Sequence, residues 1–244
     1  MRVIRFVASA VACAAIAAPV SADVTVRSRT VQEDNGGRIA EVTEYRKGLK
    51  MRTDSSAPGM TRASIILDVR TGYTVMLWHD SKTATEHDFY QTPKLPAEKS
   101  VAATPPSVTP TSQTRKIAGS TCTVYQFRAS YPMGGIEMSG PATVVVEGSM
   151  CLVKDGPGQA DFLQIHRALA ERARGDNSLL ITNLEVAALG VPFASEMTVS
   201  VGGNAPNAER RKIVSHTTEV TSISTEPIPD SIFEIPAEYT VTKR

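Results

Sequence analysis

The stretch that decides the fold runs from Gln113 to Gly158. It reads QTRKIAGSTCTVYQFRAS (113–130), then a Gly-rich bend, then PATVVVEGSMCLVKDGPG (141–158). Both runs are typical of β-strands, and each carries one cysteine, Cys122 in the first and Cys151 in the second. The stretch shows no convergent reactive groups, so it predicts the fold and does not indicate a reaction. The strands that it predicts are Thr114–Arg128 and Ala142–Lys154.

The first 22 residues are typical of a signal peptide. Arg2 and Arg5 form a positive start, and residues 6–19 are an uncharged apolar run. Val20-Ser21-Ala22 is a small-residue cleavage site, which predicts a mature chain that begins at Asp23. The apolar run is too short for a membrane span of about 20 residues. We therefore expect an exported, periplasmic protein.

The cysteine count predicts one disulfide. Cys13 leaves with the signal peptide; the alternative, less favoured because the apolar run before it is short, is a lipoprotein acylated at Cys13. Cys122 and Cys151 then remain as the only pair, and in an oxidising compartment such a pair forms a disulfide. A redox or metal pair is the other interpretation, but neither a C-x-x-C motif nor a His or Asp cluster accompanies them.

Length and charge exclude several classes of protein. The chain has 244 residues, and the 222 that follow the predicted leader are enough for one large domain or two small ones. These 222 carry 24 basic and 25 acidic side chains, a balance that argues against nucleic-acid binding. No later segment is long and apolar enough to cross a bilayer. We predict a single domain with a Pro-rich loop at about 91–112.

Short strands recur before that loop. Asn35-Gly36-Gly37 and Thr71-Gly72 are hairpin turn signals between alternating runs, which favours an antiparallel meander. In the run 73–79 both faces are largely apolar, so this strand is either central or lines a cavity. The predicted strands are Asp23–Val31, Arg38–Arg46, Leu49–Asp54, Ser64–Arg70, Tyr73–His79 and Thr83–Phe89.

The C-terminal half contains one clear helix. Gln159–Arg174 carries Phe162, Ile165 and Leu169 at helical spacing, with charged residues between them. Leu179–Val191 is apolar and is either a second helix or a buried run. Further strands are predicted at Pro192–Gly202, Arg211–Ser224 and Glu238–Thr242.

Several short motifs resemble an exported bacterial family of unassigned function that is similar to the LolA/LolB lipoprotein-carrier fold. The motifs are YRKGLKMR (45–52), KIAG (116–119), Cys122 with Tyr125, and IFEIPAEY (232–239). The resemblance spans roughly residues 40–240. It implies a mainly β fold: a curved antiparallel sheet that forms an incomplete barrel around one or two helices. In the carrier proteins, acyl chains enter the space between sheet and helices.

A ligand site in such a fold would use apolar residues of the strands and of the helix. The same residues can equally form a packed core between sheet and helix. The candidate ligand-binding residues are Met76, Trp78, Tyr125, Phe127, Val144, Val146, Phe162, Ile165 and Leu169.

Catalytic and metal-binding patterns are weak. His79-Asp80 and His87-Asp88 sit at predicted hairpin ends, but adjacent strand residues point to opposite faces, so neither pair chelates as a unit. His166 lies beside the apolar stripe of the helix and is expected to be a partly buried helix residue. No Gly-x-Ser-x-Gly, His-Glu-x-x-His or Walker motif occurs. We expect no catalytic residue, no metal and no cofactor.

The sequence therefore supports a non-catalytic carrier-like half-barrel that binds an apolar ligand, either a lipid or an acylated partner. A different hypothesis is an envelope interaction module with a fully packed core and a protein partner. A solid core would argue against the carrier. An exported hydrolase is a more distant alternative.

Overall fold

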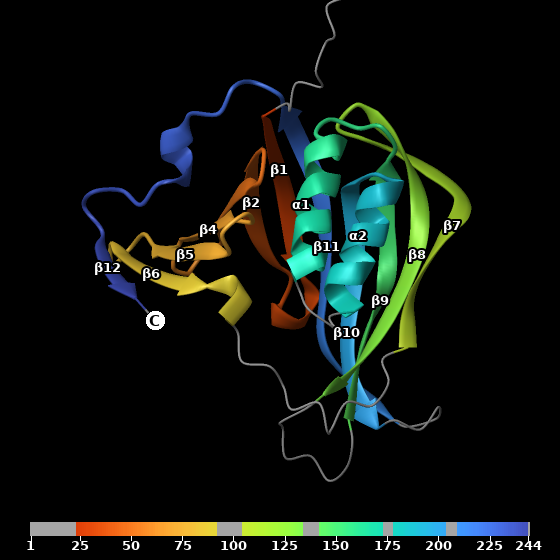
Figure 1. The fold of residues 1–244 in the computed structure, drawn as a ribbon. Helices are drawn as coiled ribbons and strands as arrows, with labels where there is room; N and C mark the ends of the chain where they lie inside the picture. The colour runs from red at the N-terminus through yellow and green to blue at the C-terminus, as the bar shows by residue number, and fades with distance from the viewer. Residues whose placement is uncertain (1–22, 92–103, 134–141, 173–177, 204–208, 244) are drawn as a thin grey trace, which may run out of the picture.

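The computed structural model describes residues 23–91, 104–133, 142–172, 178–203 and 209–243. The predicted signal peptide, including Cys13, lies outside these residues. The described chain is mainly β, with two α-helices and one curved, open sheet (Figure 1). The strands are β1 Val24–Gln32, β2 Arg38–Lys47, β3 Lys50–Ser56, β4 Ala63–Asp68, β5 Tyr73–Trp78, β6 Thr83–Asp88, β7 Thr104–Ile117, β8 Ser120–Met133, β9 Ala142–Val153, β10 Val191–Gly203, β11 Arg210–Ser224 and β12 Thr240–Lys243, and the helices are α1 Gln159–Arg172 and α2 Ser178–Leu189.

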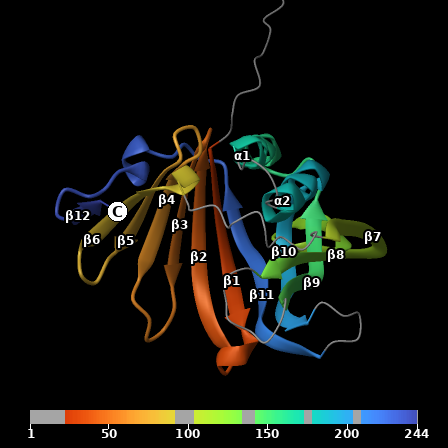
Figure 2. The ribbon, with the colours of Figure 1, turned by 60° about the horizontal axis from the view of Figure 1, so that its bottom comes forward.

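All twelve strands belong to one sheet, in the order β12-β6-β5-β4-β3-β2-β1-β11-β10-β9-β8-β7 (Figure 2). The pairing of β1 with β11 joins the N-terminal meander to the C-terminal strands in the middle of the sheet. The neighbours are antiparallel except at one edge, where β12 runs parallel to β6. The expectation of a wholly antiparallel sheet is therefore wrong at this edge, because the chain returns to it through a long connection after β11.

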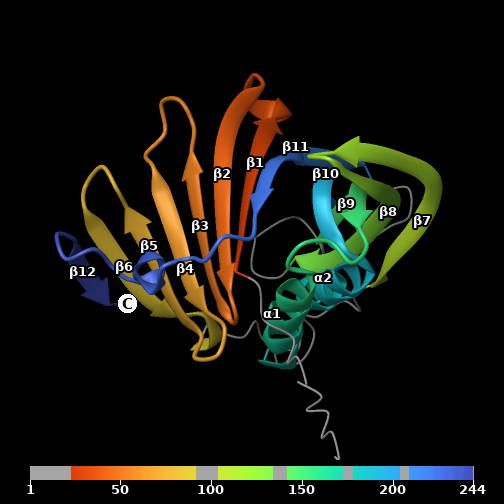
Figure 3. The ribbon, with the colours of Figure 1, turned by 90° about the horizontal axis from the view of Figure 1, so that it is seen from above.

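The two helices lie side by side on one face of the sheet, which arches over them (Figure 3). The turn before α1 needs glycine: Gly158 has φ +71°, and a Cβ there would lie 2.5 Å from the Val24 side chain. The carbonyl of Gly158 accepts a hydrogen bond from Phe162 N–H at 2.9 Å, which starts the helix. The apolar run after residue 178 is the second helix rather than a buried strand. Val186 and Ala187 of α2 are fully buried.

The segment between β11 and β12 covers the opposite face of the sheet. Ile228 and Phe233, the latter in a short 3-10 helix, pack on Ile66, Val75 and Leu77. Since successive strand residues alternate between faces, α1, which packs on Met51 and Leu67, and this C-terminal segment lie on opposite sides of β3 and β4. On β5, this segment covers the face that carries Val75 and Leu77.

The strand predicted at Thr114–Arg128 is wrong. The chain turns at Ala118 and Gly119, whose φ angles are +45° and +82°, so this run is the end of β7 and the start of β8. An Ala-Gly pair is a weak turn signal, because alanine rarely adopts positive φ.

The Pro-rich loop predicted at about 91–112 is also corrected in part. Residues 92–103 lie outside the described chain, but Thr104 begins β7, which includes three prolines. The register breaks between Thr104 and Ser107 and again between Pro110 and Thr114. Strand β7 lies at the edge of the sheet, where missing N–H donors and local bulges are tolerated.

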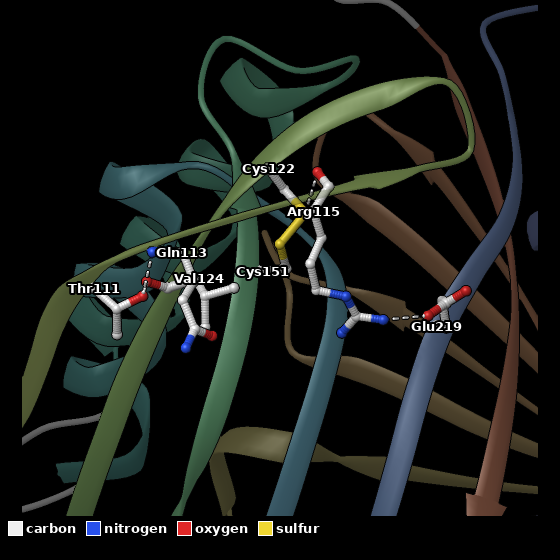
Figure 4. The surroundings of a disulfide bond; sticks show 7 residues. All are labelled: Thr111, Gln113, Arg115, Cys122, Val124, Cys151 and Glu219. Atoms are coloured by element: carbon white, nitrogen blue, oxygen red, sulfur yellow. Dashed lines mark hydrogen bonds and ion pairs between the residues drawn. A yellow bond between two sulfur atoms is a disulfide. The ribbon is translucent and has the colours of Figure 1, made fainter.

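The predicted disulfide between Cys122 and Cys151 is confirmed. It joins β8 to β9, with the two Cα atoms 5.3 Å apart (Figure 4). Both cysteines are buried in a core formed by β1 and β7–β11. Nearby, the Arg115 guanidinium of β7 reaches a Glu219 carboxylate oxygen of β11 at 2.7 Å. This ion pair therefore links the edge strand β7 to β11 across the three strands that lie between them in the sheet.

Candidate functional site

Helix α1 contacts one face of the sheet, called here the helix-side face, through residues of its predicted apolar stripe. Ile165 and Leu169 of α1 pack on Val69, with Met51 and Leu67 alongside. Ile165 is fully buried, and Leu169 is 6% exposed. These two predicted ligand-binding residues are therefore occupied by contacts between the helix and the sheet.

Phe162, the third residue of the stripe, contacts a buried charged group. The Arg46 guanidinium of β2 lies over its ring at 4.5 Å from the centroid, a cation–π contact. Arg46 is 4% exposed, and its Nε donates a hydrogen bond to the Glu44 carboxylate. A buried arginine is not predicted here, because YRKGLKMR (45–52) has the pattern of an alternating strand with exposed charges.

His166 completes this cluster. Its ring meets that of Phe162 edge to face, with centroids 4.4 Å apart. Burial is the main cause that lowers the pKa of His166 to about 4; the Arg46 charge acts in the same direction, and the Glu44 carboxylate opposes it. The imidazole is therefore neutral at pH 7. The prediction of a partly buried helix histidine agrees with this placement.

Beyond the edge of α1, the helix-side face has a patch of apolar side chains. Ile65 of β4 pairs directly with Met76 of β5, and Ala63 pairs with Trp78. Ile65 is 43% exposed and Trp78 is 37% exposed, while Met76 is partly buried. Paired residues share one face of a sheet, so these three side chains form a continuous surface. We call Ile65, Met76 and Trp78 the apolar patch.

The remaining predicted residues lie in the other half of the sheet. Phe127 of β8 is 5% exposed, and Tyr125, Val144 and Val146 are partly buried. Tyr125 pairs with Met150, several strands away from Met76 and Trp78. The nine candidates therefore occupy three places: the apolar patch, the contact of α1 with the sheet, and strands β8–β9.

A hydrogen-bond network that the sequence did not predict lies on the opposite face. Ser64 Oγ is 2.6 Å from His79 Nε2, and His79 Nδ1 is 2.6 Å from the Tyr239 hydroxyl. Arg52 Nη2 donates to Ser64 Oγ at 3.3 Å and its Nη1 donates to the Ile232 carbonyl at 2.8 Å. A serine beside a histidine is the geometry of an activated nucleophile. Ser64 is fully buried beneath the C-terminal segment, however, so no substrate reaches it in this structure.

A polar cleft of about 380 Å³ lies at one end of the sheet. Lys47 Nζ is 3.0 Å from Asp230, and this hydrogen bond is the main cause that raises the pKa of Lys47 and lowers that of Asp230. Lys47 also donates to the Ile228 carbonyl at 2.7 Å, while the Asp23 carboxylate accepts the Ile228 N–H at 2.6 Å. These contacts anchor the start of the C-terminal segment.

No protein-family model matches the chain, and no curated protein matches its sequence significantly. Among the described residues, no helix has the length and apolar character needed to cross a membrane. The same residues contain no group of three or more His, Cys, Asp or Glu side chains placed to hold a metal ion.

Proposed function

We propose that this protein is an exported, periplasmic binding protein that holds a single-chain lipid on the helix-side face of a LolA/LolB-like half-barrel, without catalysis. The observation that carries the proposal is the apolar patch of Ile65, Met76 and Trp78, which lies uncovered beside α1. Removing such side chains from water contributes about 25 cal/mol per Å² of apolar area. An alkyl chain laid along the patch would bury it.

The buried Ser64 supports binding over catalysis. Its hydroxyl lies within hydrogen-bond reach of His79, but the C-terminal segment closes that face of the sheet. A hydrolase would need this pair at an accessible surface. On the helix-side face, the strand partners of the apolar patch on β3 and β6 are threonines: Thr53 pairs with Ile65, Thr85 with Met76 and Thr83 with Trp78.

Trp78 allows a direct test, because it is the only tryptophan of the chain. We expect lysophosphatidylcholine with one lauroyl chain, added below its micellar concentration, to shift Trp78 emission to shorter wavelength with saturation. Ile65→Lys should weaken this binding at least about tenfold, since it places a charge in the apolar contact. Ile213→Lys is the matched control, because Ile213 of β11 is 51% exposed and outside the patch.

A second candidate function is protein binding through the same patch, as an envelope interaction module. The packing of Ile165 and Leu169 against the sheet favours it, because α1 leaves no room for a ligand beneath those residues. No shift of Trp78 emission with any lipid, and no acyl species extractable from protein purified from the periplasm, would overturn the lipid proposal and favour this one. The export proposal is tested by N-terminal sequencing, which should begin at Asp23.

A further inference from the structure

Two buried polar atoms near α1 have no hydrogen-bond partner. Among the described residues, Arg46 Nη1 and His166 Nδ1 are the buried side-chain nitrogen or oxygen atoms left unpaired. Nearly all buried polar atoms in native proteins have a hydrogen-bond partner, either in the protein or in an ordered water, and an amphiphile's polar head can take the place of such a water. Two such atoms in one small region therefore point to a polar group that binds there.

The two atoms belong to one cluster. Arg46 lies 4.5 Å from the Phe162 centroid, and the His166 ring lies 4.4 Å from the same centroid. The guanidinium and the imidazole therefore both contact the ring of Phe162. Strand β2 and helix α1 thus bring a guanidinium donor and an imidazole nitrogen to one place.

The charge of this cluster decides what kind of group fits. Glu44 already accepts a hydrogen bond from Arg46 Nε and balances the guanidinium charge. A second carboxylate or a phosphate would bring an unbalanced negative charge beside Glu44. An uncharged group avoids this cost, because its oxygen accepts from Arg46 Nη1 and an O–H or N–H can donate to His166 Nδ1.

The sheet register connects this cluster to the apolar patch. Glu44 pairs with Thr53, Thr53 with Ile65 and Ile65 with Met76, so one row of side chains crosses the helix-side face. With strands about 4.8 Å apart, Ile65 lies about 10 Å from Glu44 along this row. A head group held at the cluster would therefore leave its alkyl chain directed over the patch.

We propose that Arg46 and His166 bind the uncharged polar head of a single-chain amphiphile, an alcohol, an amide or a hydroxyl-bearing ester, whose alkyl chain lies on the apolar patch. This inference rests on the proposed function and specifies its ligand class. Both unpaired atoms are closed to solvent in the structure, whereas the Glu44 side chain is 25% exposed. The head therefore enters beside Glu44, which stays paired with Arg46, and binding requires α1 to move aside.

The test compares three dodecyl-chain probes by Trp78 emission: 1-monolauroylglycerol, laurate and dodecyltrimethylammonium, each below its micellar concentration. We expect the neutral glyceride to bind at least about tenfold more tightly than either ion. His166→Phe keeps an aromatic ring against Phe162 and removes the nitrogen. It should weaken glyceride binding about fivefold, the loss expected for one hydrogen bond, and leave both ions unchanged. Ile65→Lys should weaken the binding of every probe whose alkyl chain lies on the apolar patch.

The outcomes separate the two proposals. Equal affinity for the three probes, or a His166→Phe variant that keeps the full preference for the glyceride, would overturn the head-group site and leave the lipid-binding function standing. In that case ordered water pairs the two nitrogens, which a high-resolution crystal structure would show. If no probe shifts Trp78 emission, the proposed function fails and the head-group site fails with it.

Discussion

His166 should make the protein less stable in mild acid. Its pKa is about 4 in the folded chain, against an ordinary value of 6.5, chiefly because burial disfavours the charged imidazolium. Between these two values the unfolded chain binds more protons than the folded one, so the free energy of unfolding falls as the pH falls from about 6.5 to about 4. For this pair of pKa values the loss is about 2 kcal/mol at pH 5 and about 3 kcal/mol at pH 4, relative to pH 7.

Urea unfolding at pH 7 and pH 5, followed by far-UV circular dichroism, measures this loss. Carboxylates also titrate in acid, so the informative quantity is a comparison between two proteins. His166→Phe has no titrating group at this position and keeps a ring for Phe162 to contact. We expect the wild-type chain to lose about 2 kcal/mol more than the variant between pH 7 and pH 5.

The reasoning would be refuted if both proteins lost the same free energy. That result would mean that His166 is solvated when protonated, or that α1 moves away from Arg46 in acid at little cost. The slope of the free energy of unfolding against urea concentration separates these cases. If α1 is already detached in the folded protein, unfolding exposes less new surface and the slope is smaller.

Three further predictions concern packing and cross-links. Replacing Cys122 and Cys151 by alanine should lower the free energy of unfolding by about 3–4 kcal/mol for a separation of 29 residues, and peptide mapping without reductant should recover the two peptides joined in the wild type. Gly148→Ala should cost more than about 2 kcal/mol, because its Cβ would lie 1.8 Å from a backbone carbonyl oxygen on β10; an unchanged melting temperature would contradict this packing. Tyr239→Phe removes the partner of His79 Nδ1 and should cost about 1–2 kcal/mol in urea unfolding; a neutral result would mean that water replaces the hydroxyl.

The N-terminal strands could be predicted from sequence because their turns have strong signals. Asn35-Gly36-Gly37 and Thr71-Gly72 lie between alternating runs, and strands begin and end within two residues of the predicted positions. The turn at Ala118 was missed because its geometry asks for positive φ at a residue that disfavours it. The start of β7 was missed because its prolines favour a loop unless the strand lies at an edge.

The site could be predicted only where local pattern determines it. The stripe on α1 is confirmed as a buried helix face, since spacing alone fixes which residues share that face. The pairing of His79 with Tyr239 spans 160 residues, and no local period connects them. The buried Arg46 was missed for the same reason, because its burial depends on a helix that follows more than 100 residues later.

The ambiguity at β5 shows what sequence could and could not settle about a ligand. Two apolar faces indicate either a central strand or a cavity wall. In the structure, one face of β5 is covered and the other carries exposed side chains. The C-terminal segment is anchored near Ile228 by Lys47 and Asp23 and near Tyr239 by His79, so the Val75 face is closed from both ends. Helix α1 covers only part of the other face and leaves the apolar patch exposed. A molecule that contacts β5 without displacing the C-terminal segment therefore meets the helix-side face of this strand.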